Sequence, residues 1–412
     1  MRKAQTKLRH LQNLLNATLC DNAFNENNSQ LAIHRHVVNH QQTISTTDSG
    51  AQAIACGNKH MDIRKIALRG WLLLCCFTAH AASEVTIAQR FSHQSKILNT
   101  TLSYQVYLPE SYHSDKKAHF PVVYLLDGEA HFTHAVGMLE SLHSGMWPQV
   151  PEMIVVGVSN ENRMANYTPT KATQLPNGES APAPYKQTGQ GPDFLRYLEN
   201  ELVPVIDDVF RTQAPNILVG HSFGGIMALS ALAQTHRFSG LVALDPSLWY
   251  DYPRLNDQLI ASLSQPVTRP VALFVAAADM PITPSLGRST VHRDYIVAFN
   301  DRLNAHKTDN TELAIESQGV FYPGTNHHDI YHWGFYDAMK WLFDGYRINF
   351  GYQTINAEAV IADYAAMNKR LGANLKPSLP YLKRAVAKLS RDKALNENPD
   401  EVRKLIHHFY SK

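Results

Sequence analysis

A strand–turn–helix pattern in the middle of the chain constrains the fold more than any other feature. Residues 217–219 are an apolar run, residues 220–225 read Gly-His-Ser-Phe-Gly-Gly, and small and apolar residues continue to position 229. This is the setting of a nucleophile elbow, in which a serine lies on a tight turn between a buried strand and a helix. Glycines supply the very small neighbours that such a turn needs. We therefore predict that Ser222 is a nucleophile, with the N-terminus of the next helix turned towards an anion formed beside it.

Strand and helix patterns alternate on both sides of this turn. The run at 102–108 alternates apolar and polar residues and is stopped by a proline, which predicts a half-buried, antiparallel strand. Other expected strands are longer apolar runs, typical of strands that are buried on both faces. Further strands are expected at 120–126, 153–158, 240–244, 270–276 and 312–320, and helices near 225–235, 291–306 and 331–343. This order predicts an α/β fold with a mostly parallel central sheet and helices on both faces.

Composition excludes several classes of site. The formal net charge is only +2 and no basic block occurs, so nucleic acid is not an expected partner. The four cysteines all lie at or before position 76. The folded body therefore has no cysteine for a disulfide framework, a thiolate metal site or a cysteine nucleophile.

The first 81 residues have the pattern of an exported protein. Residues 1–60 are polar and aperiodic, which predicts a disordered segment or an upstream extension annotated in error. Residues 61–81 read as a signal peptide that starts at Met61, with a basic start, a short apolar run and a cleavage site near Ala81. The apolar run is too short for a comfortable membrane span, and Leu74 disfavours lipidation of Cys75. We expect export to the periplasm and no stable membrane span once the signal peptide is removed.

The remainder divides into a body at 84–346 and a helical extension at 353–412. Apolar residues recur at helical spacing in three stretches of the extension, and residues 398–401 read Asn-Pro-Asp-Glu, a capped helix start. No 34-residue self-similarity supports a tetratricopeptide module. The extension has no recognisable nucleophile or metal set, so we expect it to contribute structure; binding of a protein partner is the alternative.

A serine nucleophile needs a base, and the base needs a carboxylate to orient it. Asp245 and Asp279 are the two acids that follow strands beyond Ser222. Asp245 follows the very next strand, which is early for this role, so Asp279 is the preferred acid. The alternative role for Asp279 is that of an aspartate in a turn or at a helix cap.

Histidines crowd one segment after the last predicted strand, where the base is required. His327, His328 and His332 lie there, and zinc is disfavoured because only Asp329 could join them as a carboxylate ligand. His221 abuts the serine and is expected to pack or to line the pocket. The predicted oxyanion donors are the backbone N–H groups of Phe223 and Glu129.

Four motifs together resemble the putative-esterase branch of the α/β-hydrolases, which includes enterochelin and ferri-bacillibactin esterases, esterase D and mycolyltransferases. They are Tyr-Leu-Leu-Asp-Gly at 124–128, the elbow at 220–225, Asp-Pro-Ser-Leu-Trp at 245–249 and Tyr-Pro-Gly-Thr-Asn-His at 322–327. The resemblance covers roughly 95–345. It implies an α/β-hydrolase fold, selects His327 over His328 as the base, and puts the acid where Asp279 stands. The family often has serine where this chain has Asp245.

These patterns predict an exported serine esterase that acts through Ser222, His327 and Asp279 without a cofactor. The alternatives are an esterase of catecholate siderophore trilactones and a non-catalytic exported binding protein. Phe223, Trp249 and Tyr250 suggest an apolar or aromatic acyl pocket. Arg163, on the long loop after residue 160, is a candidate to hold a polar or anionic part of a small-molecule ester.

Overall fold

The computed structural model describes residues 85–173, 180, 185, 187–262, 267, 269–279, 290–309, 314–351, 354–392 and 398–411. The upstream extension and the signal peptide predicted for residues 1–81 lie outside these ranges. All described residues belong to one compact unit, Ser83–Lys412. No helix in these ranges has both the length and the apolar character that spanning a bilayer requires.

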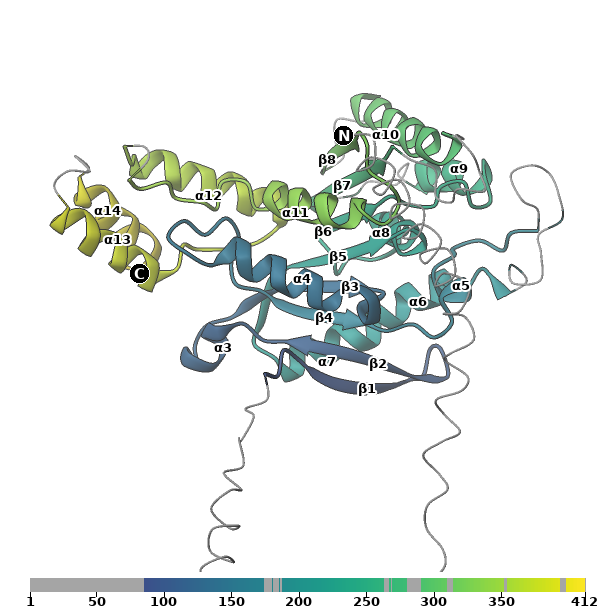
Figure 1. Cartoon of the computed structure of the whole chain (residues 1–412), viewed down its shortest axis with the longest axis horizontal. Helices are drawn as coiled ribbons and strands as arrows, with labels where there is room; N and C mark the ends of the chain where they lie inside the picture. The colour runs from purple at the N-terminus through teal and green to yellow at the C-terminus, as the bar shows by residue number, and fades with distance from the viewer. Residues whose placement is uncertain are drawn as a thin grey trace, which may run out of the picture. The chain divides into compact units, whose positions relative to one another are not determined.

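A central eight-stranded sheet organises the body (Figure 1). Its strands are β1 (Gln89–Ser95), β2 (Thr100–Tyr107), β3 (Phe120–Leu126), β4 (Ile154–Val158), β5 (Thr212–His221), β6 (Gly240–Leu244), β7 (Val271–Ala278) and β8 (Ile315–Tyr322). Their order across the sheet is β1-β2-β4-β3-β5-β6-β7-β8. Pairing is antiparallel between β1, β2 and β4 and parallel from β4 to β8.

Helices cover both faces of the sheet, as the apolar strands require. Alternate residues of β5 point to opposite sides: Leu218 joins one apolar core, and Ile217 and Val219 join the other. The body helices are α3 (Glu110–Ser114), α4 (Gly128–His143), α5 (Arg163–Asn166), α6 (Gly191–Tyr197), the π-helix η3 (Leu198–Leu202), α7 (Val203–Val209), α8 (Phe223–Gln234), α9 (Arg254–Ser262), α10 (Val291–Asp309) and α11 (Ile330–Leu342). Residues of α8 and α10 lie in the first core, and residues of α4 and α11 in the second.

Three further helices follow the sheet: α12 (Ala357–Leu371), α13 (Leu379–Arg391) and α14 (Pro399–Tyr410). Tyr364, Leu382 and Val402 are buried in the same apolar core as α4 and α11. The Tyr364 hydroxyl donates to the Tyr346 carbonyl at 2.7 Å, so polar contacts also join this extension to the body.

The predicted architecture is confirmed: a mostly parallel α/β sheet, helices on both faces and a C-terminal helical extension. Strand β1 was not predicted, because its residues are mostly exposed and polar at the edge of the sheet. Parallel strands end at a common edge, so Ser222 after β5, Asp245 after β6 and the loop after β8 come together there.

Candidate active site

Ser222 lies at a sharp turn between β5 and α8. Its backbone has φ 62° and ψ −117°, a conformation that costs a non-glycine residue roughly 1–3 kcal/mol. A Cβ on Gly220 would lie 2.0 Å from the carbonyl oxygen of Gly224, so only glycine fits at position 220. The sequence therefore holds the partly exposed serine in a strained turn, the arrangement predicted for a nucleophile elbow.

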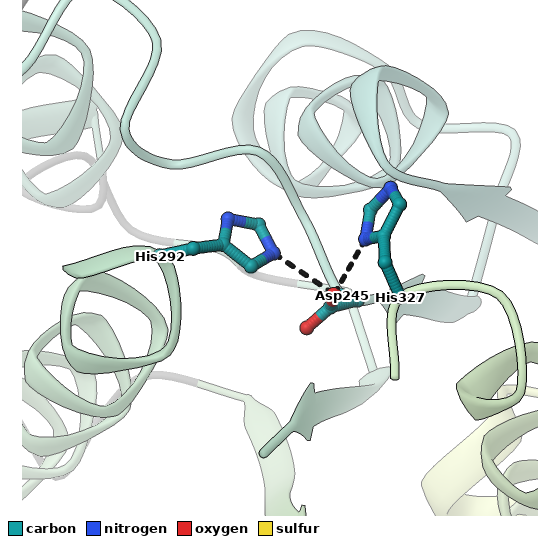
Figure 2. A group of neighbouring side chains, drawn as sticks. All are labelled: Asp245, His292 and His327. Atoms are coloured by element: carbon teal, nitrogen blue, oxygen red, sulfur yellow. Dashed lines mark hydrogen bonds and ion pairs between the residues drawn. The ribbon is translucent and has the colours of Figure 1, made fainter. Parts of the chain in front are cut away.

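His327, in the loop between β8 and α11, is fixed in one tautomer by a carboxylate. Its Nδ1 lies 2.6 Å from Oδ2 of Asp245 (Figure 2). An ionised carboxylate only accepts, so Nδ1 carries the proton and Nε2 keeps the lone pair of a base. In Figure 2 the second ring nitrogen of His327 points away from Asp245. His328, the neighbouring candidate, is exposed.

Asp245 was the less favoured of the two candidate acids in the sequence. Its side chain is fully buried and faces the site. Its backbone has φ 45°, and its Oδ1 accepts a hydrogen bond from the Ala278 N–H at 2.9 Å. Burial alone would raise the pKa of the Asp245 carboxyl. The imidazoles of His292 and His327 outweigh burial and hold that pKa well below its usual range. Asp245 is therefore an anion at neutral pH.

The predicted pairing of Asp279 with His327 is wrong. The Asp279 carboxylate faces Arg293, with Nη1 at 2.9 Å from Oδ1, and accepts from the Gly324 N–H at 3.1 Å. Its side chain is 35% exposed, whereas that of Asp245 is at 0%. The carboxylate that contacts His327 is that of Asp245, which follows β6, one strand earlier than expected.

His221, the last residue of β5, ties this strand to the loop that carries His327. Its Nε2 lies 2.6 Å from the His327 carbonyl oxygen, and the two rings are 4.4 Å apart. Since a carbonyl only accepts, Nε2 of His221 carries the proton. Burial first, and then the His327 imidazole, lower the pKa of His221 to about 3. His221 is thus a neutral, buried residue that joins β5 to the loop of His327. It packs beneath the site, which is one of the two roles expected from the sequence.

Ser222 has a hydrogen-bond partner that the sequence did not indicate. Oγ of Ser222 is 3.0 Å from Oγ of Ser247, and the Ser247 N–H donates to the Ser222 carbonyl at 3.1 Å. Ser247 is buried in the motif at 245–249. The position of Ser247 in this motif is the sequence signal from which its place beside the elbow could have been predicted.

Two helix N-termini meet next to Ser222. Helix α8 begins at Phe223, and α4 begins at Gly128 after Asp127, whose backbone is left-handed. A Cβ on Gly224 would be 3.5 Å from Oδ2 of Asp127, so the two turns are in contact. The N–H groups of Phe223 and Glu129 lie in first helical turns, where no carbonyl of the same helix is available. Such N–H groups favour a negative charge.

Arg163 makes hydrogen bonds within the protein and also faces the site. Its Nε and Nη2 reach the two oxygens of buried Asp127 at 2.8 and 3.0 Å, and Nη2 also donates to the His221 carbonyl at 3.2 Å. Burial raises the pKa of Asp127, and Arg163 partly offsets this. The guanidinium stays one-third exposed, with Nη1 lacking a recorded partner among the described residues. A role in holding substrate therefore remains a prediction for Nη1.

Aromatic residues flank the nucleophile on one side. The Phe223 ring lies 5.4 Å from the Arg163 guanidinium and 5.9 Å from the Trp249 ring, which is partly exposed. Tyr250, in contrast, is fully buried, and its hydroxyl donates to the Thr170 carbonyl at 2.6 Å. Tyr250 therefore packs behind the rings of Phe223 and Trp249 and does not line the surface of the site.

Asp245, His292 and His327 are also the group of three potential metal ligands among the described residues. Ligand atoms about 2.0–2.1 Å from a tetrahedral ion lie roughly 3.3 Å from each other. The contacts to Oδ2 of Asp245 are 2.6 Å from His327 and 2.9 Å from His292. Both contacts are shorter than the spacing of two ligands on one ion, and the 2.6 Å contact fits a hydrogen bond between His327 and Asp245.

Comparison with known proteins gives consistent matches. A family model described as "putative esterase" matches residues 95–277. An IroE-like serine hydrolase from Shewanella oneidensis is 35% identical, with 78% of this chain and 99% of that chain covered and a TM-score of 0.71. "Uncharacterized protein YbbA" of Bacillus subtilis is 25% identical over 58% of this chain and 92% of its own length. The ferri-bacillibactin esterase BesA of the same organism is 25% identical over 44% of this chain and 67% of its own.

Proposed function

The chain belongs to the putative-esterase branch of the α/β-hydrolases and is a carboxylic-ester hydrolase, and from that premise we propose that Ser222, His327 and Asp245 carry out its reaction. The observation that carries this proposal is the 2.6 Å contact between His327 and the buried Asp245 carboxylate. It leaves Nε2 of His327 free to act as a base at the edge of the sheet where Ser222 lies.

In this proposal Oγ of Ser222 attacks the ester carbonyl while Nε2 of His327 takes the serine proton. Asp245 stabilises the imidazolium that forms, and the N–H groups of Phe223 and Glu129 hold the oxyanion. The imidazolium then gives its proton to the leaving alcohol. Water attacks the acyl-serine with His327 again as the base, which releases the acid and restores Ser222.

Replacing the nucleophile tests the proposal. Ser222→Ala should lower kcat/KM on p-nitrophenyl acetate by about 10⁴-fold or more. It should also abolish labelling by a fluorophosphonate probe. Ser230→Ala, the same change at a buried serine later in α8 whose hydroxyl donates to the Ile226 carbonyl, is the matched control and should keep both properties. Hydrolysis and labelling that survive in Ser222→Ala would show that another group is the nucleophile.

A siderophore ester is the second candidate for the natural substrate. BesA is named as a ferri-bacillibactin esterase, and the chain offers an aromatic and cationic wall in Phe223, Trp249 and Arg163. Such a wall suits aryl groups that carry negative charge. A panel comparing a catecholate trilactone with simple aryl and short-acyl esters tests this candidate. A kcat/KM for the trilactone no higher than that for p-nitrophenyl acetate would reject it.

Export remains part of the proposal. It rests on the sequence pattern at 61–81. N-terminal sequencing of the protein from the producing cell should give a chain that starts near residue 82, in the periplasmic fraction. A mature protein that retains peptides from residues 1–60 would contradict this.

A further inference from the structure

The carboxylate of Asp245 faces a second histidine besides His327. His292, in the first turn of α10, is buried, and its Nε2 lies 2.9 Å from Oδ2 of Asp245. The rings of His292 and His327 are 5.5 Å apart and nearly perpendicular, and Figure 2 shows both turned towards the one carboxylate. Oδ2 therefore meets two imidazole nitrogens, while Oδ1 accepts from the Ala278 N–H.

The surroundings of His292 define its protonation state. Nε2 faces a carboxylate oxygen, so it carries a proton. Its contact with Oδ2 is close but bent and falls short of a good hydrogen bond. Nδ1 is buried without a hydrogen-bond partner among the described residues. Among the described residues no acceptor faces Nδ1 for the second N–H of an imidazolium, so the neutral Nε2–H tautomer fits the described contacts.

We propose that His292 is a positioning residue of the proposed esterase site: its neutral Nε2–H faces the Asp245 carboxylate and shares the negative charge of that carboxylate with His327. The inference rests on the proposed triad. A carboxylate that already faces the N–H of His292 stabilises the His327 imidazolium less strongly. Loss of the His292 N–H would therefore strengthen this stabilisation and move the acidic limb of the pH–activity profile to higher pH.

Other ionisable groups around the pair do not replace this contact. Among the described residues, the groups that face His327 or flank His292 are His221 from β5, Asp245 after β6 and His328 beside His327. Arg293, next to His292, pairs with both Asp279 and Asp294. His221 is neutral, because burial and the neighbouring imidazole lower its pKa. Arg293 offsets part of the charge of Asp279 and Asp294, and both carboxylates are exposed enough for solvent to screen them.

Two substitutions at one position test the inference in the full chain. His292→Gln keeps a neutral N–H donor, and His292→Phe removes it while keeping a planar ring. The kcat/KM on p-nitrophenyl acetate is measured from about pH 5 to about pH 9. The acidic midpoint should move to higher pH by about half a unit to one unit in His292→Phe, so that activity below the midpoint falls about 3- to 10-fold. His292→Gln should keep the wild-type midpoint within about 0.3 unit.

The midpoint does not depend on how much of a variant folds, because inactive protein lowers the rate equally at every pH. A wild-type midpoint in both variants, or a downward shift in His292→Phe, would reduce His292 to a packing residue and overturn the inference. An upward shift of equal size in both variants would mean that His292 acts as a cation, which also overturns it. Failure of the underlying triad gives a different result: Asp245→Asn would keep the wild-type rate while Ser222→Ala lost it.

Discussion

Replacing each candidate acid by its amide separates the two assignments of the triad. Asp245→Asn removes one negative charge beside the His327 imidazolium and changes almost no volume. The 2.6 Å contact puts the two charge centres about 4 Å apart, and at an effective dielectric constant of about 20 their attraction is about 4 kcal/mol. Since about 1.4 kcal/mol corresponds to a tenfold change in rate, we expect kcat to fall by about 10³-fold.

Asp279→Asn is the matched control, because it makes the same chemical change after the neighbouring strand. Asp279 is partly exposed and pairs with Arg293, and it makes no contact with His327 among the described residues. Its loss should therefore change kcat by no more than about threefold. Initial rates on p-nitrophenyl acetate at saturating substrate measure both effects, and circular dichroism shows whether each variant is folded. A folded Asp279→Asn that loses about 10³-fold, beside an active Asp245→Asn, would refute the reasoning from geometry.

Three further predictions concern stability. Gly220→Ala should give insoluble or unfolded protein, because the new methyl group would meet the Gly224 carbonyl at 2.0 Å. Gly137→Ala, on the open face of α4, should keep or raise the melting temperature of the wild type. A Gly220→Ala variant that melts at the same temperature as Gly137→Ala would contradict this. The lowered pKa of His221 means that between about pH 6.5 and about pH 3 the unfolded chain binds a proton at His221 and the folded chain does not. The free energy of unfolding of the wild type should therefore decrease as pH falls through this window. Calorimetry should show a smaller decrease for His221→Gln. Truncation after residue 352 should lower the melting temperature by exposing apolar core while kcat on small esters is kept; a stable truncation without turnover would place the extension in the active site.

Local patterns predicted much of this protein correctly. The apolar runs that became β3, β5, β6 and β7 are continuous because helices cover both faces of the sheet, and such runs are visible without any knowledge of contacts. The elbow was equally visible, since a strand, three glycines and a helix are adjacent in the chain.

The parts that were missed depend on contacts between distant residues. Asp245 and Asp279 both follow strands, and only the direction in which each carboxylate turns decides between them. That direction is set by the φ of Asp245 and by the capture of Asp279 by Arg293, neither of which leaves a mark in the sequence. His292 is a single histidine at a helix start, 47 positions from Asp245, and nothing in its neighbourhood points to the acid.

The contacts of Arg163 have a consequence for the evolution and engineering of specificity. The loop after β4 is long and would be the natural segment to exchange between relatives in search of new substrates. Yet Arg163 in this loop joins the Asp127 turn to the carbonyl of His221, and both lie beside the nucleophile. A transplanted loop without an arginine at this point would leave a buried carboxylate uncompensated. Loop exchange is therefore expected to succeed only when the graft begins beyond Arg163.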